Sequence, residues 1–101
     1  MSYNPQPIDP SELNALKQNG WILSDTGNAI AKEFKFKNFQ KAIAWMVQMS
    51  FKAEALNHHP EWQNVYSLVT VRLTTHDTGG LTDLDAKLAR AMDASLAVDQ
   101  S

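Results

Sequence analysis

All three histidines of this chain lie in one stretch of the sequence, at His58, His59 and His76. Histidine is the one side chain whose ordinary pKa, about 6.5, lets it exchange a proton near neutral pH. The occurrence of all three histidines in one region therefore predicts either proton transfer or metal binding. Glu54 precedes His58 by one helical turn, and a carboxylate at that spacing can orient an imidazole or stabilise its charge.

Simpler explanations exist for several of these residues. Glu54 and His58 could form a solvated pair at a helix end, and such pairs contribute little to stability. Three histidines and a water would also match a catalytic zinc site. Adjacent histidines before a proline project in different directions and seldom bind one ion together, so a metal is the less favoured alternative. Thr82 and Asp85 have the spacing of a capping box, which favours a structural role for Asp85.

Turn and cap residues divide the first half of the chain. Asp9-Pro10 begins a helix that we expect to end at Asn19-Gly20. Residues 21–23 then form a short strand. Apolar and charged residues alternate from residue 29 to residue 37, which predicts a second strand with one face on a core. Lys32 falls on the apolar face, a break that an edge strand tolerates.

The longest expected helix spans about residues 39–57, with Asn38 as its N-cap. It carries two apolar stripes, whereas a surface helix needs only one, about 100° wide. One stripe consists of Phe39, Ile43, Met46, Val47, Ser50 and Ala53, and the other of Ala42, Trp45, Met49, Lys52 and Leu56. We expect one stripe to pack on the sheet and the other to mediate self-association. A helix buried entirely in its own core is less favoured in so small a domain.

Pro60 ends that helix, and two β-rich runs follow at residues 62–66 and 68–75. One face of the second run holds Val69, Val71, Leu73 and Thr75, and the other holds Thr70, Arg72, Thr74 and His76. The last helix is expected to begin after Thr82, to bury Leu84, Leu88, Ala91 and Ser95, and to fray from Val98. Because His76 ends the polar face of its strand, we predict that the three imidazoles converge at the open side of the sheet.

These elements predict an α+β fold, in the order α-β-β-α-β-β-α. It is a mostly antiparallel four-stranded sheet with three helices on one face. We expect a single domain over residues 1–101, with a short tail at residues 1–8. The tryptophans Trp21, Trp45 and Trp62 are expected in the core. Trp62 is close enough in sequence to the histidines to border a ring-shaped ligand.

Composition excludes several classes of function. The net charge of −2 argues against a surface that follows a phosphate backbone. The absence of cysteine excludes disulfides and thiol catalysis. Residues 1–7 lack the charged start and apolar run of a signal peptide, and no apolar run approaches the roughly 18 residues that a membrane helix needs. We therefore expect a soluble, cytoplasmic protein that binds neither nucleic acid nor membranes.

One spacing pattern resembles the signature of the pterin-4a-carbinolamine dehydratase family. It comprises Glu54, His58, His59, Pro60, Tyr66, His76 and Asp85. The resemblance extends over nearly the whole chain. It implies the removal of water from 4a-hydroxytetrahydropterin to give quinonoid dihydropterin in tetrahydrobiopterin recycling, with no metal and no organic cofactor. It also implies a homodimer or homotetramer, assembled through the long helix and the sheet edges.

The resemblance also implies roles for individual residues. The catalytic candidates are His58, His59 and His76, with Glu54 orienting His58. The substrate-binding candidates are Glu54, Asn57, His58, His59, Pro60, Thr74, Thr75, His76 and Asp77. Losing the 4a-hydroxyl requires one proton delivered to the leaving oxygen and one removed from the neighbouring ring nitrogen. Both transfers suit groups that titrate near neutral pH.

Two alternatives to a dehydratase concern protein partners. In the vertebrate branch of the family, the protein binds the dimerisation helices of a homeodomain transcription factor as a coactivator. Such a role is not expected here, because no basic localisation run is present. A catalytically silent interaction module is the other alternative. It predicts that partner binding is lost on Trp45→Glu or Met49→Glu in the long helix.

Overall fold

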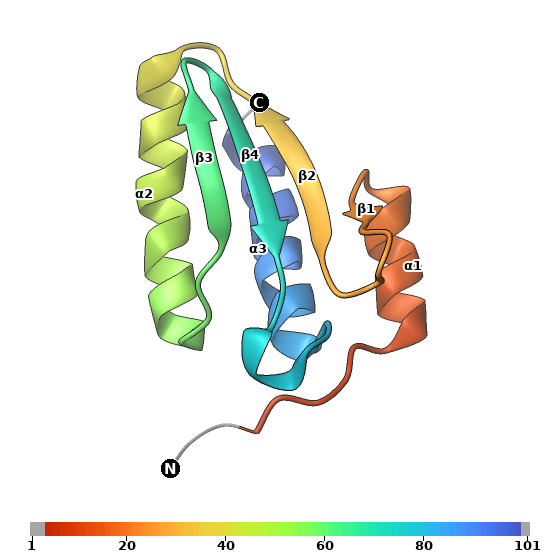
Figure 1. Ribbon diagram of the computed structural model, residues 1–101. Helices are drawn as coiled ribbons and strands as arrows, with labels where there is room; N and C mark the ends of the chain where they lie inside the picture. Colours follow the sequence, from red (N-terminus) through yellow and green to blue (C-terminus); the bar gives the residue numbers. More distant parts are fainter. Residues whose placement is uncertain (1–3, 100–101) are drawn as a thin grey trace.

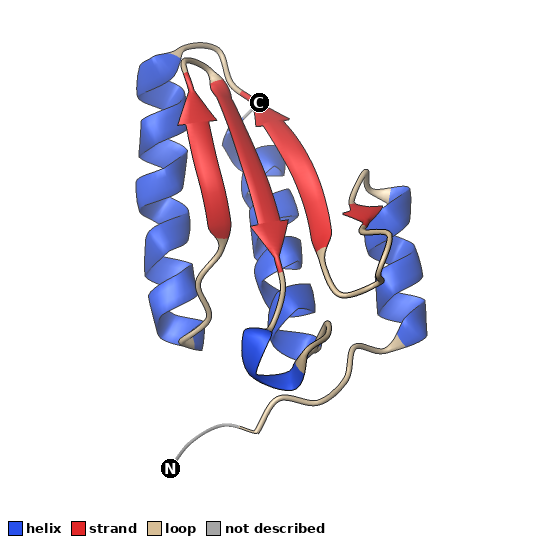
Figure 2. Ribbon diagram, in the orientation of Figure 1, coloured by secondary structure: helices blue, strands red, loops and turns tan. Residues whose placement is uncertain are grey.

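Four antiparallel strands form one sheet in the computed structural model of this chain, and three helices cover one face of that sheet (Figures 1 and 2). The structure describes residues 4–99. The elements in chain order are α1 (Pro10–Gln18), β1 (Ile22–Leu23), β2 (Ile30–Lys35), α2 (Phe39–Leu56), β3 (Glu61–Val65), β4 (Leu68–Leu73), the 3₁₀ turn η1 (His76–Thr78) and α3 (Asp83–Asp99). The strands are ordered β1-β2-β4-β3 across the sheet. The predicted class and element order are confirmed.

The helices begin at the caps that the sequence predicts. The Asp9 side chain accepts a hydrogen bond from the backbone N–H of Ser11 at the start of α1. The Asn38 side chain accepts one from the N–H of Lys41 at the start of α2. At the other end of α2, Asn57 takes a left-handed conformation with φ 51°, which asparagine tolerates better than most residues. These local signals set where α2 begins and where it ends.

The core lies between the sheet and the helices. On β4, Val69, Val71 and Leu73 are fully buried, whereas Thr70 and Arg72, on the other face, are partly exposed. The alternation predicted for this strand is therefore confirmed. The largest side chains that are fully buried between the layers are Trp21, Trp45, Phe34, Leu16, Ile30, Leu88 and Met92. Among the described residues, no helix lies on the second face of the sheet (Figure 2).

Lys32 is not on an edge strand, contrary to the sequence prediction. Its strand, β2, lies between β1 and β4, although β1 pairs only with Ile30 and Ala31. The Lys32 ammonium contacts the Asp93 carboxylate at 2.7 Å and the Asn19 carbonyl oxygen at 2.6 Å. A charge on the core side of a sheet is tolerated when it is paired and hydrogen-bonded. A partner on α3, and not a free strand edge, therefore accommodates this lysine.

The two apolar stripes of α2 have different environments. Ala42, Trp45, Met49 and Ala53 are buried against the rest of the chain. The large apolar side chains of α2 that are exposed are Phe39, Ile43, Val47 and Phe51. The prediction of two faces is correct, but their membership changes. Ala53 belongs to the buried face and Met46 packs, partly buried, against the core. Lys52 is exposed, and Phe51 joins the exposed face. We call Phe39, Ile43, Val47 and Phe51 the exposed face of α2.

The buried side of α3 is rotated from the predicted one. Leu84 and Leu88 are buried as expected, but Ala91 and Ser95 are only partly buried. Ala86, Ala89 and Met92 are fully buried in their place. The predicted fraying begins at Val98, whereas the helix continues to Asp99, and residues 100–101 lie outside the described residues. The fully buried first-turn residue Asp85 precedes Ala89 by four residues and Met92 by seven, so it lies on the same side of the helix as they do.

The expected N-terminal tail is attached to the body of the protein from residue 6 onward; residues 1–3 lie outside the described residues. Pro7 forms a β-bridge with Thr82. The N–H of Ile8 donates to the Leu81 carbonyl at 3.1 Å, and the N–H of Gln6 donates to an Asp83 carboxylate oxygen at 3.0 Å. This segment therefore fastens the chain start to the first turn of α3.

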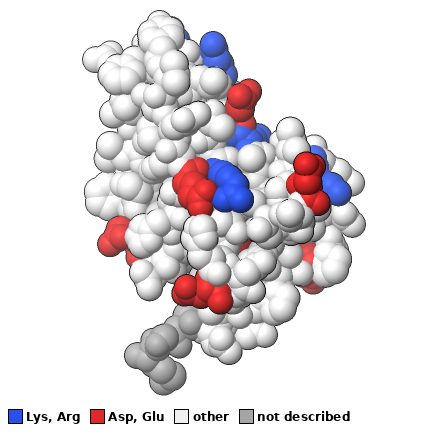
Figure 3. All heavy atoms as spheres, in the orientation of Figure 1, with Lys and Arg blue, Asp and Glu red and all other residues white. Residues whose placement is uncertain are grey.

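The charges on the uncovered sheet face are few and mixed in sign. Figure 3 shows this side with small groups of acidic and basic side chains next to one another, separated by uncharged surface. A phosphate backbone requires an extended basic surface, which this face does not offer. Within residues 4–99, no helix combines the length and apolarity needed to cross a membrane.

Ile30 and Ile22 provide a matched pair to test the core. Ile30 is fully buried, whereas Ile22 on the neighbouring strand is 71% exposed. We expect Ile30→Ala to lower the free energy of unfolding by about 2–5 kcal/mol because it leaves a cavity. Ile22→Ala should change it by no more than about 0.5 kcal/mol. Urea unfolding followed by circular dichroism measures both, and equal effects would contradict the described core.

Candidate active site

The three histidines line one hollow of about 230 Å³. The hollow lies between the segment that follows α2 and the segment that leads from β4 into η1. Both segments are at the lower end of the molecule in Figure 1. Its lining residues are Asn57, His58, His59, Thr74, Thr75, His76 and Asp77. The predicted convergence of the imidazoles is therefore present. Glu54 and Pro60, also candidates from the sequence, do not line the hollow but flank it in the chain.

The end of α2 decides where the two adjacent histidines point. The N–H groups of Asn57 and His58 donate to the carbonyls of Glu54 and Ala53, each at 3.0 Å, which closes the helix with Asn57 in the left-handed conformation. His58 therefore lies just beyond the helix, whereas its predicted pairing with Glu54 required it to continue the last helical turn. After this turn His58 is 8% exposed, whereas His59 lies at the surface.

His58 is held by the buried carboxylate of Asp85. The distance between His58 Nε2 and Asp85 Oδ1 is 2.6 Å, and Asp85 is fully buried. Asp85 Oδ2 accepts from the Thr75 hydroxyl at 2.7 Å and from the Thr82 N–H at 2.9 Å. The Thr82 bond is the capping-box contact that the spacing predicts. The bonds to His58 and Thr75 were missed, because no local pattern shows which distant groups a cap residue also meets.

Glu54 pairs with His59 and not with His58, which corrects the sequence prediction. Its Oε1 lies 2.6 Å from His59 Nε2, and both side chains are largely exposed. The expected pair assumed that the helix continues through residue 58, with side chains four residues apart on one face. Because Asn57 leaves the helical conformation, His58 turns inward and His59 comes to lie beside Glu54.

His76 also has a carboxylate partner, which the sequence analysis did not select. The Glu61 Oε2 lies 2.8 Å from His76 Nε2, and the Glu61 Oε1 accepts from Arg72 Nη1 at 2.7 Å. The hydrogen bonds from Arg72 and then from His76 lower the pKa of Glu61 from its ordinary value of 4.5. The only sequence signal for Glu61 is its place directly after Pro60.

The three imidazole–carboxylate pairs determine which chemistry the hollow supports. Each imidazole uses Nε2 to contact a different carboxylate, and no described residue hydrogen-bonds to its Nδ1. Within residues 4–99, no group of three or more histidine and acidic side chains is arranged to hold a metal ion. The arrangement thus offers three oriented imidazoles that can take or give protons at one hollow.

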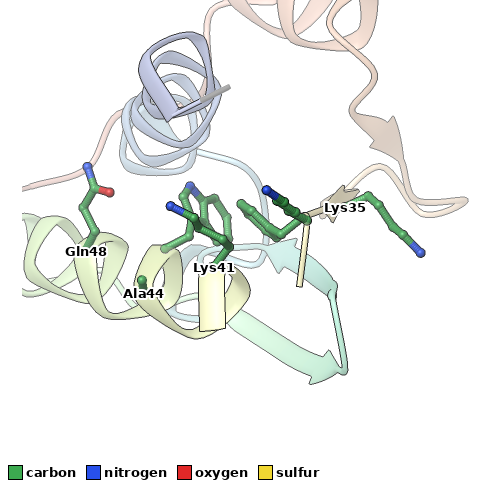
Figure 4. A pocket seen from close by; sticks show the side chains of 7 residues that line it. Lys35, Lys41, Ala44 and Gln48 are labelled. Carbon is green, nitrogen blue, oxygen red and sulfur yellow. The ribbon is translucent and has the colours of Figure 1, made fainter. Parts of the chain in front are cut away.

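A larger hollow, of about 540 Å³, lies elsewhere and lacks such groups. Its lining residues are Lys35, Phe36, Lys37, Lys41, Ala44, Trp45 and Gln48. Figure 4 shows that the Lys35 side chain extends away from Lys41 and Gln48, so the charges do not converge. Trp62, which the sequence analysis placed beside the histidines, does not line their hollow; its ring lies 6.3 Å from that of Trp45. The histidine hollow is therefore the candidate active site.

Comparison with known proteins places the chain in a family. The family model described as Pterin 4 alpha carbinolamine dehydratase matches residues 6–95. The chain belongs to this family. The match includes all three histidines and their carboxylate partners Glu54, Glu61 and Asp85.

Individual relatives of the pterin-4a-carbinolamine dehydratase family agree with this assignment. A protein of Rhizobium johnstonii is 55% identical over 86 residues, which is 85% of each chain. One of Ruegeria pomeroyi is 56% identical over 82 residues, 81% of this chain and 84% of the relative. Both carry the name "Putative pterin-4-alpha-carbinolamine dehydratase".

Two solved structures share the fold. The crystal structure of a transcriptional coactivator/pterin dehydratase from Brucella melitensis is 44% identical, with a TM-score of 0.78 over 88% of this chain and 97% of that one. A pterin dehydratase-like protein identified as a RuBisCO assembly factor in the alpha-carboxysome is 19% identical, with a TM-score of 0.62 over 73% and 86% of the two chains. At that identity, the second likeness concerns the fold alone.

Asp85→Ala tests the buried carboxylate. It removes a helix cap and takes away the acceptor of the Thr82 N–H and the partner of the His58 ring. The Thr75 hydroxyl keeps only its contact with Thr82 Oγ1. We expect the free energy of unfolding to fall by about 3 kcal/mol. Asp25→Ala, in an exposed turn, is the control and should change it by about 0.5 kcal/mol or less. Thermal or urea unfolding measures the difference, and a loss below about 1 kcal/mol for Asp85→Ala would contradict the described network.

Proposed function

We propose that this protein removes water from 4a-hydroxytetrahydropterin, a pterin 4a-carbinolamine, to give quinonoid dihydropterin. The observation that carries the proposal is the hollow lined by His58, His59 and His76, each paired with its own carboxylate. The reaction transfers no electrons to an acceptor and forms no bond to the protein. It requires one proton delivered to the leaving hydroxyl and one taken from the neighbouring ring nitrogen. Positioned imidazoles meet both requirements at neutral pH.

The three imidazoles differ in mobility and access to solvent. The His58 ring is buried and fixed by Asp85, so it can approach a bound substrate in only one orientation. His59 and His76 are exposed, which lets them exchange protons with water between turnovers. We propose that a bound pterin meets the fixed ring and the two exposed rings together. One fixed ring and two exposed rings would together allow proton transfer to and from the substrate. The exposed rings would then recover their starting protonation state by exchange with solvent.

The rim of the hollow offers polar groups for recognising a pterin. Asn57 contributes an amide and Asp77 a carboxylate, and both are exposed. A pterin ring has an edge of adjacent N–H and carbonyl groups, which amide and carboxylate side chains can pair with. Thr74 and Thr75 line the hollow, but their hydroxyls already donate to the Asn28 carbonyl and to Asp85. We therefore propose that the polar groups at the rim bind the pterin ring. The proposed reaction uses no metal and no organic cofactor. Tetrahydrobiopterin recycling is the process that such an activity would serve.

Replacing each histidine by alanine tests the proposed chemistry. We expect each of His58→Ala, His59→Ala and His76→Ala to lower kcat for a synthetic 4a-carbinolamine, by about 10²–10⁴-fold for the histidines that transfer the protons. Dehydration is followed by the absorbance of the quinonoid product. Gln63→Ala, an exposed change on β3, is the control and should leave the rate unchanged. Wild-type rates in folded His59→Ala and His76→Ala would reject the assignment.

A second proposal concerns the exposed face of α2. We infer that copies of the chain associate through this face into a homodimer or homotetramer. Its apolar side chains are up to 73% exposed, at Phe51, and soluble monomers rarely leave a continuous apolar surface uncovered. Trp45 and Met49, where a change to glutamate was predicted to abolish partner binding, are buried in the chain's own core. Substituting them would unfold the protein and would not test an interface.

Val47→Glu and Phe51→Glu test this association. Both place a charge on the exposed face, and burying an unpaired charge in an interface is unfavourable. Sedimentation should therefore show a homo-oligomer for the wild type and a folded monomer for either variant. Gln48→Glu, an exposed change on the same helix outside this face, is the control and should keep the oligomer. A wild-type monomer at micromolar concentration would contradict self-association and favour a different protein partner.

A further inference from the structure

Glu61 and Arg72 occupy opposite positions on neighbouring strands beside the histidine hollow. The two residues are directly paired in the antiparallel register of β3 and β4. Residues paired in this way have side chains about 5 Å apart on one sheet face and interact. His76 begins the turn that follows β4 after two further residues. The backbone of the sheet, and not a flexible loop, therefore fixes the positions from which both side chains reach toward His76.

The Glu61 carboxylate joins the two other side chains without sharing an oxygen. Arg72 Nη1 donates to Oε1 at 2.7 Å, and Oε2 lies 2.8 Å from His76 Nε2. We propose that Glu61 is a positioning residue for His76 and that Arg72 holds Glu61 in place, a role that rests on the dehydratase function proposed above. Glu61 and His76 form the third imidazole–carboxylate pair of the hollow. Among the described residues, it is the only one of the three pairs whose carboxylate also contacts an arginine.

The chemical consequence is a defined state of the imidazole. An ionised carboxylate has acceptors only, so the His76 Nε2 that faces it must carry the hydrogen. When the ring is neutral, its Nδ1 is then an unprotonated acceptor, available to a bound molecule. Without Glu61, the hydrogen of the neutral ring would be distributed between the two nitrogens. Glu61 thus selects the tautomer in which His76 can accept a proton through Nδ1.

The surrounding charges support an ionised Glu61. The hydrogen bond from Arg72, followed by that from His76, keeps the pKa of Glu61 below its ordinary value. The other charged groups around His76 are Asp77 on the same turn and, across the hollow, His58 and His59 with their partners Asp85 and Glu54. Arg72 is the only one of these groups that is always cationic. It therefore balances the negative charge that Glu61 brings to the rim.

A purely structural role would have little effect at this position. Glu61, Arg72 and His76 have side chains that are 45%, 42% and 78% exposed. Exposed ion pairs contribute little to stability, because water screens the two charges. Changes at Glu61 should therefore leave the protein folded, so an effect on the His76 ring or on the rate would report positioning and not unfolding.

Nitrogen NMR of ¹⁵N-histidine-labelled full-length protein tests the proposal. At a pH where the ring is neutral, the wild type should show His76 protonated at Nε2, and Glu61→Ala should show a mixture of both tautomers. Glu61→Gln, which keeps an acceptor oxygen but can also donate, should lie between them. Arg72→Gln should shift the His76 ring part of the way toward the mixture of tautomers seen in Glu61→Ala, because Glu61 is then held less firmly. It should also raise the pKa of Glu61 toward 4.5, measured by carboxyl ¹³C NMR. Glu54→Ala should change the tautomer of the His59 ring and leave that of His76 unchanged, because the Glu54 carboxylate contacts His59 and not His76.

The rate assay is run on the same samples. Glu61→Ala should lower kcat for the 4a-carbinolamine about tenfold or more, as expected for loss of a group that orients a catalytic imidazole, with KM changed less than kcat. Gln63→Ala, two residues further along the same strand face, is the matched control for both measurements. If the wild type is active but Glu61→Ala changes neither the His76 tautomer nor kcat, only the positioning role is overturned. If the wild type does not dehydrate the carbinolamine, the proposed function fails and this role fails with it.

Discussion

The structure depends on one buried carboxylate. Asp85 has no exposure to solvent, and its two oxygens accept from or contact three groups on different segments: His58 after α2, Thr75 after β4 and Thr82 before α3. A buried carboxylate is strongly unfavourable unless such partners surround it. The three segments therefore have to meet at this point. The same requirement that completes the α3 cap places the His58 ring against the wall of the hollow.

The second constraint is the left-handed turn at Asn57. It separates two adjacent histidines into one buried ring and one surface ring, and it gives them different carboxylates, Asp85 and Glu54. Because the turn follows directly on α2, the helix that carries the exposed apolar face also ends at the hollow. Association through that face and chemistry at that corner would therefore involve one rigid element.

The sequence predicted the elements and the location of the hollow better than it predicted the side-chain partners. Caps at Asp9 and Asn38 and the alternation along β4 are local signals, so helix starts and strand faces followed from them. The partner of Glu54 was predicted wrongly, because helical spacing holds only while the helix continues. Glu61 was missed since its contact with His76 depends on strand pairing over a separation of 15 residues, which no local pattern encodes. Lys32 was assigned to an edge because its partner, Asp93, lies on an element far along the chain.

The attachment of residues 6–8 to the start of α3 has a practical consequence for handling this protein. Gln6 and Ile8 clamp Leu81 and Asp83 from outside, on either side of the Thr82 that Asp85 caps. A shorter version of the protein could be designed to start at α1, without the residues before it. That version would lack the hydrogen bonds that Gln6 and Ile8 make. The resulting protein would keep every histidine, yet the helix start behind the hollow would be freer to open.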